Sequence, residues 1–318
     1  MADMAEPSVQ AIDLTKRYGQ FTALSKLNLK IEGSKCVGFL GPNGAGKTTT
    51  LKIFTDMIRP SEGKALINGI DVHRQKKKAL ENCGALIETP EIYPSLTAKE
   101  ALIMIAEIKG IPRKKREREA ESALSRVKMR AWADKTVGKF SKGMKQRINV
   151  AAALLGDPEV ILLDEPTSGL DPRGMSEVRD IIKNLKRENK LIFLSSHLLN
   201  EVSEICDEVA MINHGKLLAY GKIEDIVKKF SKESTNIVEV SFSRPLANSV
   251  LHKIRGINGV SKVERSGQTD LNINVKGGIP GQEKLLSRLV SMKCGVIGFK
   301  PASSALEETY LNLFKEVT

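Results

Sequence analysis

The sequence predicts an α/β domain over residues 7–230, followed by a smaller α+β domain over residues 236–318. Strand-like and helix-like segments alternate along the first of these stretches. Its clearest strands are three short apolar runs, at residues 35–40, 160–163 and 191–195. A helical pattern follows each run, near residues 46–58, 172–188 and 198–204. Alternation of this kind favours a mostly parallel sheet with helices on its faces.

The stretch from about residue 96 to residue 156 departs from this alternation, because it is helical almost throughout. Helix starts are expected at Thr97, Pro112 and Ser141. We therefore expect a helical subdomain that is inserted into the α/β core.

The last part of the chain has a pattern of its own, beyond a polar stretch at residues 230–236 that is typical of a linker. Its strands and helices are expected in the order β-α-β-β-α-β, near residues 237–242, 246–255, 259–265, 269–275, 281–292 and 296–300. A last helix is expected near residues 303–316. This order is the ferredoxin-like pattern. His252 and Cys294 have no obvious partners there, so we expect an accessory role in dimer support, regulation or docking.

Composition limits the class of protein. Hydrophobic residues make up 41% of the chain, enough to bury a core. No run of about 18 apolar residues is present, and the acidic start of the chain has no signal-peptide pattern. The cysteines are far apart, which argues against zinc and against a disulfide framework: Cys36, Cys83, Cys206 and Cys294. We expect a reducing, cytoplasmic location.

The net charge of +12 raises nucleic acid or an anionic membrane face as partners. The charge is spread, with +4 on residues 231–318 and +8 on the remainder. The densest basic run, residues 113–119, alternates in sign near its end and lies in a helical stretch. A solvated helix face explains this run without a ligand, and we expect no nucleic-acid partner.

The strongest chemical signal is a glycine-rich loop between the first buried strand and the helix that follows it. It fits the pattern GxxxxGK[ST] at every defined position. Its glycines let successive backbone N–H groups turn toward one phosphate, and the helix N-terminus adds partial positive charge. Lys47 would reach the β and γ phosphates, and the Thr48 hydroxyl would bind Mg²⁺. The expected nucleotide-binding residues are Gly41, Pro42, Asn43, Gly44, Ala45, Gly46, Lys47, Thr48 and Thr49.

An acidic pair at the end of a second buried strand supplies the matching chemistry. Four apolar residues lead directly into Asp164 and Glu165. Ligands of open α/β sheets bind at this carboxyl end of the strands. We expect Asp164 to hold the hydrated Mg²⁺ and Glu165 to act as the general base that orients water. Together with the loop, the pair predicts an ATPase.

These motifs resemble, in order and over residues 7 to about 230, the nucleotide-binding subunit of an ATP-binding cassette (ABC) transporter. The family's signature LSGGQ corresponds to residues 140–144, where only Ser141 and the second glycine, Gly143, are kept. Ser141 can cap a helix, which would create a second anion site. The resemblance implies that this site serves the ATP of a second copy of the chain, so that two copies enclose two ATP molecules.

Three further positions match the family pattern. Asp171 lies in the D-loop, which links the two ATP sites of the dimer in the family. His197 ends a strand where the family places a histidine toward the γ-phosphate, although a histidine at a strand end can also be structural. Tyr18 resembles the aromatic residue on which adenine stacks, and the alternative is a core tyrosine.

Glu88 departs from the family, which usually has glutamine at this position. A glutamate here resembles the branch that exports bacitracin-like and lantibiotic-type peptides. We expect its carboxylate to bind Mg²⁺ or order its water shell, while adding negative charge beside the γ-phosphate.

The resemblance implies an ATP-hydrolysing subunit that drives a separate transmembrane permease from the cytoplasmic face of the membrane. The cargo would be a drug, a peptide antibiotic or a lipid-like molecule. Two alternatives remain open: a non-transport ABC ATPase in translation or DNA processes, and a nucleotide-dependent regulatory module. A single cassette without a long coiled coil weighs against the first. Intact Lys47, Asp164, Glu165 and His197 weigh against the second.

Overall fold

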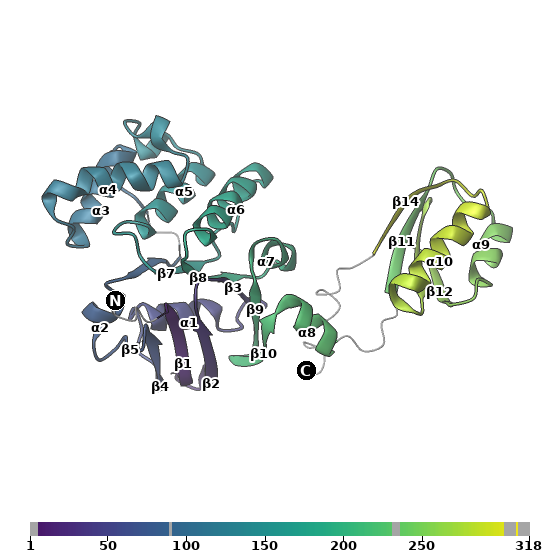
Figure 1. The fold of residues 1–318 in the computed structure, drawn as a ribbon, viewed down its shortest axis with the longest axis horizontal. Helices are drawn as coiled ribbons and strands as arrows, with labels where there is room; N and C mark the ends of the chain where they lie inside the picture. Colours follow the sequence, from purple (N-terminus) through teal and green to yellow (C-terminus); the bar gives the residue numbers. More distant parts are fainter. Residues whose placement is uncertain (1–5, 89–90, 231–235, 302–309, 311–318) are drawn as a thin grey trace. The chain divides into compact units, whose positions relative to one another are not determined.

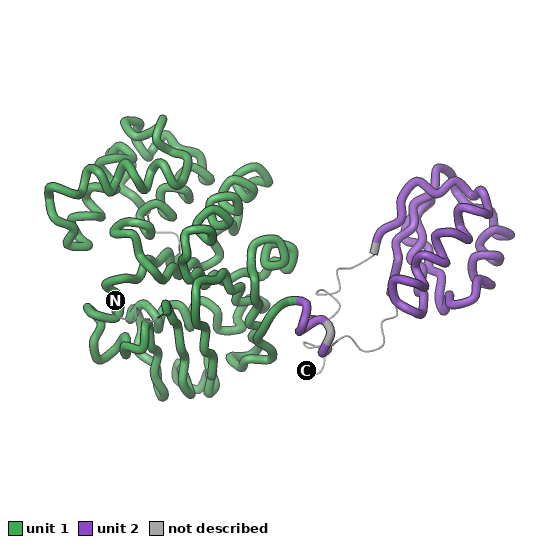
Figure 2. The backbone as a smooth tube through the Cα atoms, viewed as in Figure 1, with its two compact units in different colours: residues 1–223 green, residues 224–318 purple. Residues whose placement is uncertain are grey.

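A computed structural model describes residues 6–88, 91–230, 236–301 and Tyr310. The chain divides into two compact units, Met1–Ile223 and Glu224–Thr318 (Figure 2). This division falls at the start of helix α8 (Ile223–Phe230), whereas the predicted domain boundary lies at the end of that helix. The centre of the predicted linker and most of the predicted last helix lie outside the described residues. Within the described residues, no helix combines the length and the apolar character that a membrane crossing needs.

The core of the first unit is a six-stranded sheet in the order β10-β9-β3-β8-β7-β6 (Figure 1). The three predicted strands are β3 (Cys36–Leu40), β7 (Val160–Asp164) and β8 (Leu191–Ser196), and every residue in them is buried. They are parallel neighbours, as predicted. The other members are β6 (Cys83–Leu86), β9 (Glu208–Asn213) and an antiparallel edge strand, β10 (Lys216–Lys222).

The predicted helices follow these strands. Helix α1 (Lys47–Phe54) leaves β3, α6 (Pro172–Lys186) comes after β7, and α7 (Leu199–Ile205) comes after β8. The apolar core beneath α1 includes Phe193, whose ring centroid lies 5.1 Å from that of Phe39 and 6.4 Å from that of Phe54. This packing fixes the strand ends from which the chemical groups project.

A second sheet, in the order β2-β1-β4-β5, was not predicted. It is antiparallel and consists of β1 (Ser8–Tyr18), β2 (Phe21–Glu32), β4 (Glu62–Ile67) and β5 (Ile70–Asp71). The expectation of alternating strands and helices is therefore wrong for this part of the chain. The physical reason is that tight turns join consecutive strands, at Gly19 (φ 58°) and at Asn68–Gly69 (φ 49° and 72°). A short helix, α2 (Lys76–Leu80), follows β5.

The predicted helical subdomain is present. It contains α3 (Ala98–Ile108), α4 (Arg113–Arg126) and α5 (Lys142–Ala153), with short 3-10 turns at Arg130–Trp132 and Val137–Lys139. Thr97 caps α3 through a reciprocal pair of hydrogen bonds with Glu100, and Ser141 caps α5.

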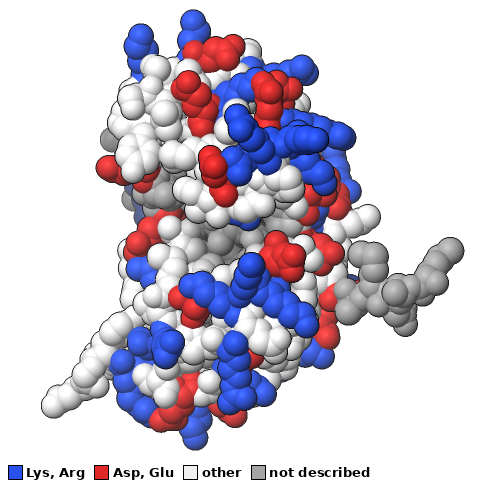
Figure 3. All heavy atoms as spheres, turned by 90° about the vertical axis from the view of Figure 1, so that its left-hand side faces the viewer, with Lys and Arg blue, Asp and Glu red and all other residues white. Residues whose placement is uncertain are grey.

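The charge is less evenly spread than expected. Residues 96–156 hold 15 Lys and Arg against 6 Asp and Glu, a net of +9. The basic run on α4 nevertheless has acidic neighbours, because Arg116 pairs with Glu107, and Glu117 and Glu121 pair with Lys99. Figure 3, which shows the side of the molecule at the left of Figure 1, has acidic side chains among the basic ones. The described contacts thus agree with a solvated helix face.

The second unit follows the predicted order of elements. After α8 come β11 (Asn236–Phe242), α9 (Asn248–Arg255), β12 (Val260–Arg265), β13 (Asp270–Val275), α10 (Gly278–Ser291) and β14 (Val296–Pro301). The strands form an antiparallel sheet in the order β12-β13-β11-β14. Alternate residues of β11 and β13 are buried against α9 and α10, so this unit has a small core of its own.

Candidate functional site

The phosphate-binding loop leads from β3 into α1, and its geometry explains its glycines. Gly44 and Gly46 have φ angles of 81° and 106°, a region that side chains with a Cβ atom avoid. A Cβ on Gly46 would lie 2.7 Å from the carbonyl oxygen of Ala23, and one on Gly41 would lie 2.3 Å from that of Ile212. The loop therefore keeps its shape only with glycine at these positions.

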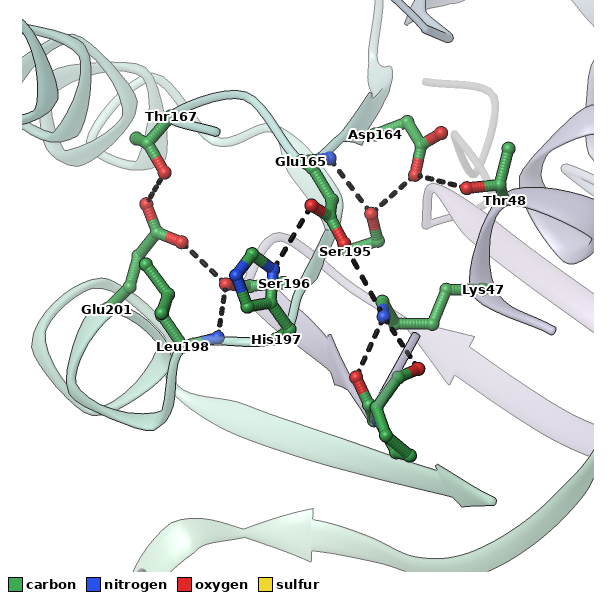
Figure 4. A network of polar contacts seen from close by, with 12 residues as sticks. Lys47, Thr48, Asp164, Glu165, Thr167, Ser195, Ser196, His197, Leu198 and Glu201 are labelled. Atoms are coloured by element: carbon green, nitrogen blue, oxygen red, sulfur yellow. Dashed lines mark hydrogen bonds and ion pairs between the residues drawn. The ribbon is translucent and has the colours of Figure 1, made fainter. Parts of the chain in front are cut away.

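Lys47, the first residue of α1, points back over this loop. Its Nζ atom donates hydrogen bonds to the carbonyl oxygens of Gly41 (2.7 Å) and Pro42 (3.1 Å). It also lies 3.4 Å from Oε1 of Glu165, and its side chain is only 5% exposed (Figure 4). The ammonium group is thus held where anionic phosphate oxygens at the loop could reach it.

Asp164 and Thr48 meet across the site, as the two sequence motifs predict. The Thr48 hydroxyl donates to Oδ1 of Asp164 at 3.2 Å, and the Ser195 hydroxyl donates to the same oxygen at 2.6 Å. Asp164 itself is almost fully buried. Ser195, on the neighbouring strand β8, was not identified from the sequence, because its role depends on how the two strands pair.

Glu165 and His197 also come together. Oε2 of Glu165 lies 3.1 Å from Nδ1 of His197, and the Glu165 backbone N–H donates to the Ser195 hydroxyl at 2.9 Å. The backbone of Glu165 has a φ of 43°, a conformation that costs energy in residues other than glycine. The carboxylate is thereby placed between the Lys47 ammonium and the His197 ring, and a quarter of the Glu165 side chain is exposed.

A cavity of about 210 Å³ lies beside the loop. Tyr18 and Phe21 line it together with the loop residues, Thr49 and Glu165. Tyr18 is 47% exposed, which excludes the alternative of a core tyrosine. Phe21, 61% exposed, is paired with Tyr18 across the β1–β2 turn and was missed from the sequence. Phe21 could have been noticed as a second aromatic residue just after the turn.

Ser141, Gly143 and Asp171 lie elsewhere. The Ser141 hydroxyl accepts the backbone N–H of Met144 at 3.2 Å, and Asp171 caps α6 by accepting the N–H of Gly174 at 3.3 Å. A Cβ on Gly143 would lie 3.4 Å from Cα of Gly174, so the two helix starts are packed side by side. None of the three predicted residues lines the described cavity beside the phosphate-binding loop.

Glu88 does not join the Asp164 cluster in the described contacts. Its carboxylate forms an ion pair with Lys52 of α1, and 60% of its side chain is exposed. Its backbone has a φ of 59°, in the left-handed region that residues other than glycine rarely adopt. The expected contact with a magnesium ion therefore stays a prediction.

The oxygen atoms at the end of β7 suit a magnesium ion. The Thr48 hydroxyl and the Asp164 carboxylate lie in hydrogen-bond contact, which brings two oxygen ligands together beside the phosphate-binding loop. Among the described residues, no group of three or more His, Cys, Asp or Glu side chains could form a closed metal site. Mg²⁺ commonly takes one or two protein oxygens, with water and substrate phosphates as its remaining ligands. The donor set thus fits a nucleotide-bound ion.

Comparison with known proteins agrees with this geometry. A family model described as "ABC transporter" matches residues 24–168. The bacitracin transport ATP-binding protein BcrA of Bacillus licheniformis is 41% identical over 225 residues, which cover 70% of this chain and 72% of that protein. The chain belongs to the ABC transporter family. As a cassette of this family, it binds and hydrolyses ATP.

Two further relatives extend the comparison. The linearmycin resistance ATP-binding protein LnrL of Bacillus subtilis (strain 168) is 28% identical over 309 residues, which cover 96% of this chain and 97% of that protein. A solved dimeric ATP-binding cassette, in a post-hydrolysis state with ADP and Pi, is 25% identical with a TM-score of 0.60. The match covers 67% of this chain and 98% of the solved chain. These likenesses confirm the predicted cassette core.

Proposed function

We propose that Glu165 and His197 form the hydrolytic centre of this cassette. The observation that carries the proposal is the position of the Glu165 carboxylate, 3.4 Å from Nζ of Lys47 and 3.1 Å from Nδ1 of His197. A carboxylate at this strand end can accept a proton from water, while a neighbouring lysine stabilises the charge of the phosphate. The contact of Glu165 with Lys47 alone, or with His197 alone, would not indicate hydrolysis.

In the proposed mechanism each group has one task. The loop N–H groups and Lys47 hold the β and γ phosphates, and Tyr18 stacks on the adenine. Glu165 orients the attacking water and takes its proton, while His197 faces the γ-phosphate side of that carboxylate. Thr48 and Asp164 would hold Mg²⁺, which neutralises charge on the phosphates when bound.

Two copies of the cassette form the complete site in this proposal. Ser141, Gly143 and Asp171 are N-terminal helix positions away from the chain's own nucleotide cavity. Helix N-termini favour anions, so these residues suit the phosphates bound by a second copy. A closed two-fold pair would use the same surface on both copies. The dimeric state of the solved relative supports this arrangement.

The proposed cellular role is to power a separate transmembrane permease from the cytoplasmic face of the membrane. The cargo would be a drug, a peptide antibiotic or a lipid-like molecule, and the direction would be export. The names of the bacitracin and linearmycin relatives support this role. Glu88 would act beside Mg²⁺ and influence turnover once the permease is present.

The Glu165→Gln variant tests the proposed centre. The amide keeps the size of the side chain but cannot take a proton from water, so multiple-turnover hydrolysis should stop while ATP still binds. Phosphate release and the affinity for a fluorescent ATP analogue are measured on the full chain. Glu159→Gln is the matched control, because Glu159 precedes the opposite end of β7. Hydrolysis by Glu165→Gln at the wild-type rate would show that Glu165 is not the general base.

A further inference from the structure

A buried bridge of three side chains lies behind the hydrolytic centre (Figure 4). The Thr167 hydroxyl donates a hydrogen bond to one carboxyl oxygen of Glu201. The Ser196 hydroxyl donates to the other oxygen at 2.6 Å, and it accepts the backbone N–H of Leu198 at 3.0 Å. Thr167, Ser196 and Glu201 are only 2–3% exposed.

Burial of the Glu201 carboxyl group at this position costs free energy. Burial of a carboxyl group is unfavourable unless its oxygens are hydrogen-bonded, and two hydroxyl donors meet that need here. An apolar residue of similar size on α7 would avoid the cost altogether. A role other than filling space is therefore expected for this side chain.

The bridge joins the two segments that carry the hydrolytic groups. Thr167 lies two residues after Glu165, in the loop that continues to Asp171, and Ser196 directly precedes His197. The same segments are connected a second time on the exposed side, by the 3.1 Å contact between Glu165 and His197. Two connections between the same segments fix both their separation and their relative rotation.

The loop between these contacts is held from its other side as well. The side-chain amide of Gln146, on α5, donates to the carbonyl oxygen of Pro166 at 2.8 Å, and Gln146 is buried. Pro166 lies between Glu165 and Thr167. The backbone on which the carboxylate is mounted is thus attached to α5 on one side and, through Glu201, to α7 on the other.

We propose that Glu201 is a positioning residue for ATP hydrolysis, which acts by holding Glu165 and His197 at their working distance. The proposal rests on the proposed roles of those two residues. Neither Thr167 nor Glu201 lines the described cavity beside the phosphate-binding loop, so neither is expected to contact the nucleotide directly. A loss of the bridge should lower kcat and leave the affinity for ATP unchanged.

Three variants of the full chain remove or keep single hydrogen bonds. Thr167→Val deletes the hydroxyl at nearly constant shape, whereas Thr167→Ser keeps it. Glu201→Gln replaces one acceptor oxygen by an amide donor that faces a hydroxyl already in use. Glu204→Gln is the matched control, because Glu204 lies on the same helix and pairs on the surface with Arg179 and Lys183.

The measurements are kcat for phosphate release and the dissociation constant of a fluorescent ATP analogue. Displacement of a reacting group by about 1 Å can cost a hundredfold in rate, so a loss of about ten- to a hundredfold is expected for Thr167→Val and Glu201→Gln. Thr167→Ser and Glu204→Gln should keep the wild-type kcat. The dissociation constant should stay within about twofold in all four variants.

A double-mutant cycle separates positioning from general stability. In a His197→Ala background the loss caused by Thr167→Val should largely disappear, because one of the two positioned groups is already absent. The proposal is overturned if Thr167→Val retains the wild-type kcat, if its loss is undiminished without His197, or if ATP affinity falls in proportion. An active Glu165→Gln variant would instead refute the proposed centre itself.

Discussion

Tyr18 offers the sharpest test of how the nucleotide is held. Its ring is 47% exposed and forms one wall of the cavity beside the phosphate-binding loop. Lys16 places its Nζ atom 4.9 Å from the centroid of this ring. A ring that is already ordered on a β-strand loses little freedom when adenine stacks on it. We predict that Tyr18→Ala removes the proposed stacking and leaves the proposed phosphate contacts intact.

The expected magnitude follows from the stacking alone. A base stacked on an aromatic side chain contributes about 1–3 kcal/mol, by analogy with single-stranded nucleic acid. This corresponds to an increase of about 5- to 150-fold in the dissociation constant for ATP. The value should lie toward the lower end if Phe21, which lines the same cavity, takes over part of the contact. Tyr18→Phe should bind nearly as well as the wild type.

The assay is isothermal titration of the full chain with ATP and, in parallel, with inorganic tripolyphosphate. The second ligand has the phosphates but no base, so Tyr18→Ala should not change its affinity. Phe21→Ala, measured in the same way, shows how the two aromatic residues share the base. Equal weakening for ATP and tripolyphosphate would refute the stacking role, because it would mean that the substitution disturbs the loop itself.

Two further predictions concern residues outside the cavity. Glu88→Gln removes an exposed ion pair with Lys52, which contributes at most about 1 kcal/mol, so ATP affinity should stay nearly unchanged. Turnover in a complex reconstituted with the permease should change, and equal turnover of both forms would contradict a role for the carboxylate. Burial raises the pKa of Cys83 to about 12, with Lys109 opposing, so the reactive thiolate is scarce at pH 8. Iodoacetamide should therefore label Cys83 slowly in the native chain and rapidly in urea, as mass spectrometry would show; labelling at the rate of a free thiol would contradict this.

The part of the fold that could be predicted from sequence is the part that local patterns encode. The strands β3, β7 and β8 are continuous apolar runs because helices cover both of their faces, and the pattern is visible without any partner. The phosphate-binding loop is equally local, since its glycines and Lys47 are neighbours in the chain. For the same reason the starts of α3 and α5 were located at their capping residues.

What was missed depends on contacts between distant segments. The antiparallel sheet at the beginning of the chain was overlooked because half-buried strands carry a weaker pattern than fully buried ones. Ser195 reaches Asp164 only because β7 and β8 pair in one register, in which Asp164 is opposite Ser195. Glu201 and Thr167 are 34 residues apart, and no sequence pattern around either residue predicts their hydrogen bond. The ion pair of Glu88 with Lys52 likewise requires the fold.

The contact between Gly143 and Gly174 has a mechanical consequence. No side chain separates the two backbones at this point, so the starts of α5 and α6 pack closely against each other. The capping residues of the two helices, Ser141 of α5 and Asp171 of α6, therefore belong to one closely packed part of the surface. A partner surface that binds here would therefore contact Ser141 and Asp171 together. An alanine Cβ has room at Gly143, whereas one at Gly174 would lie 2.8 Å from Oδ1 of Asp171 and would disturb the cap of α6.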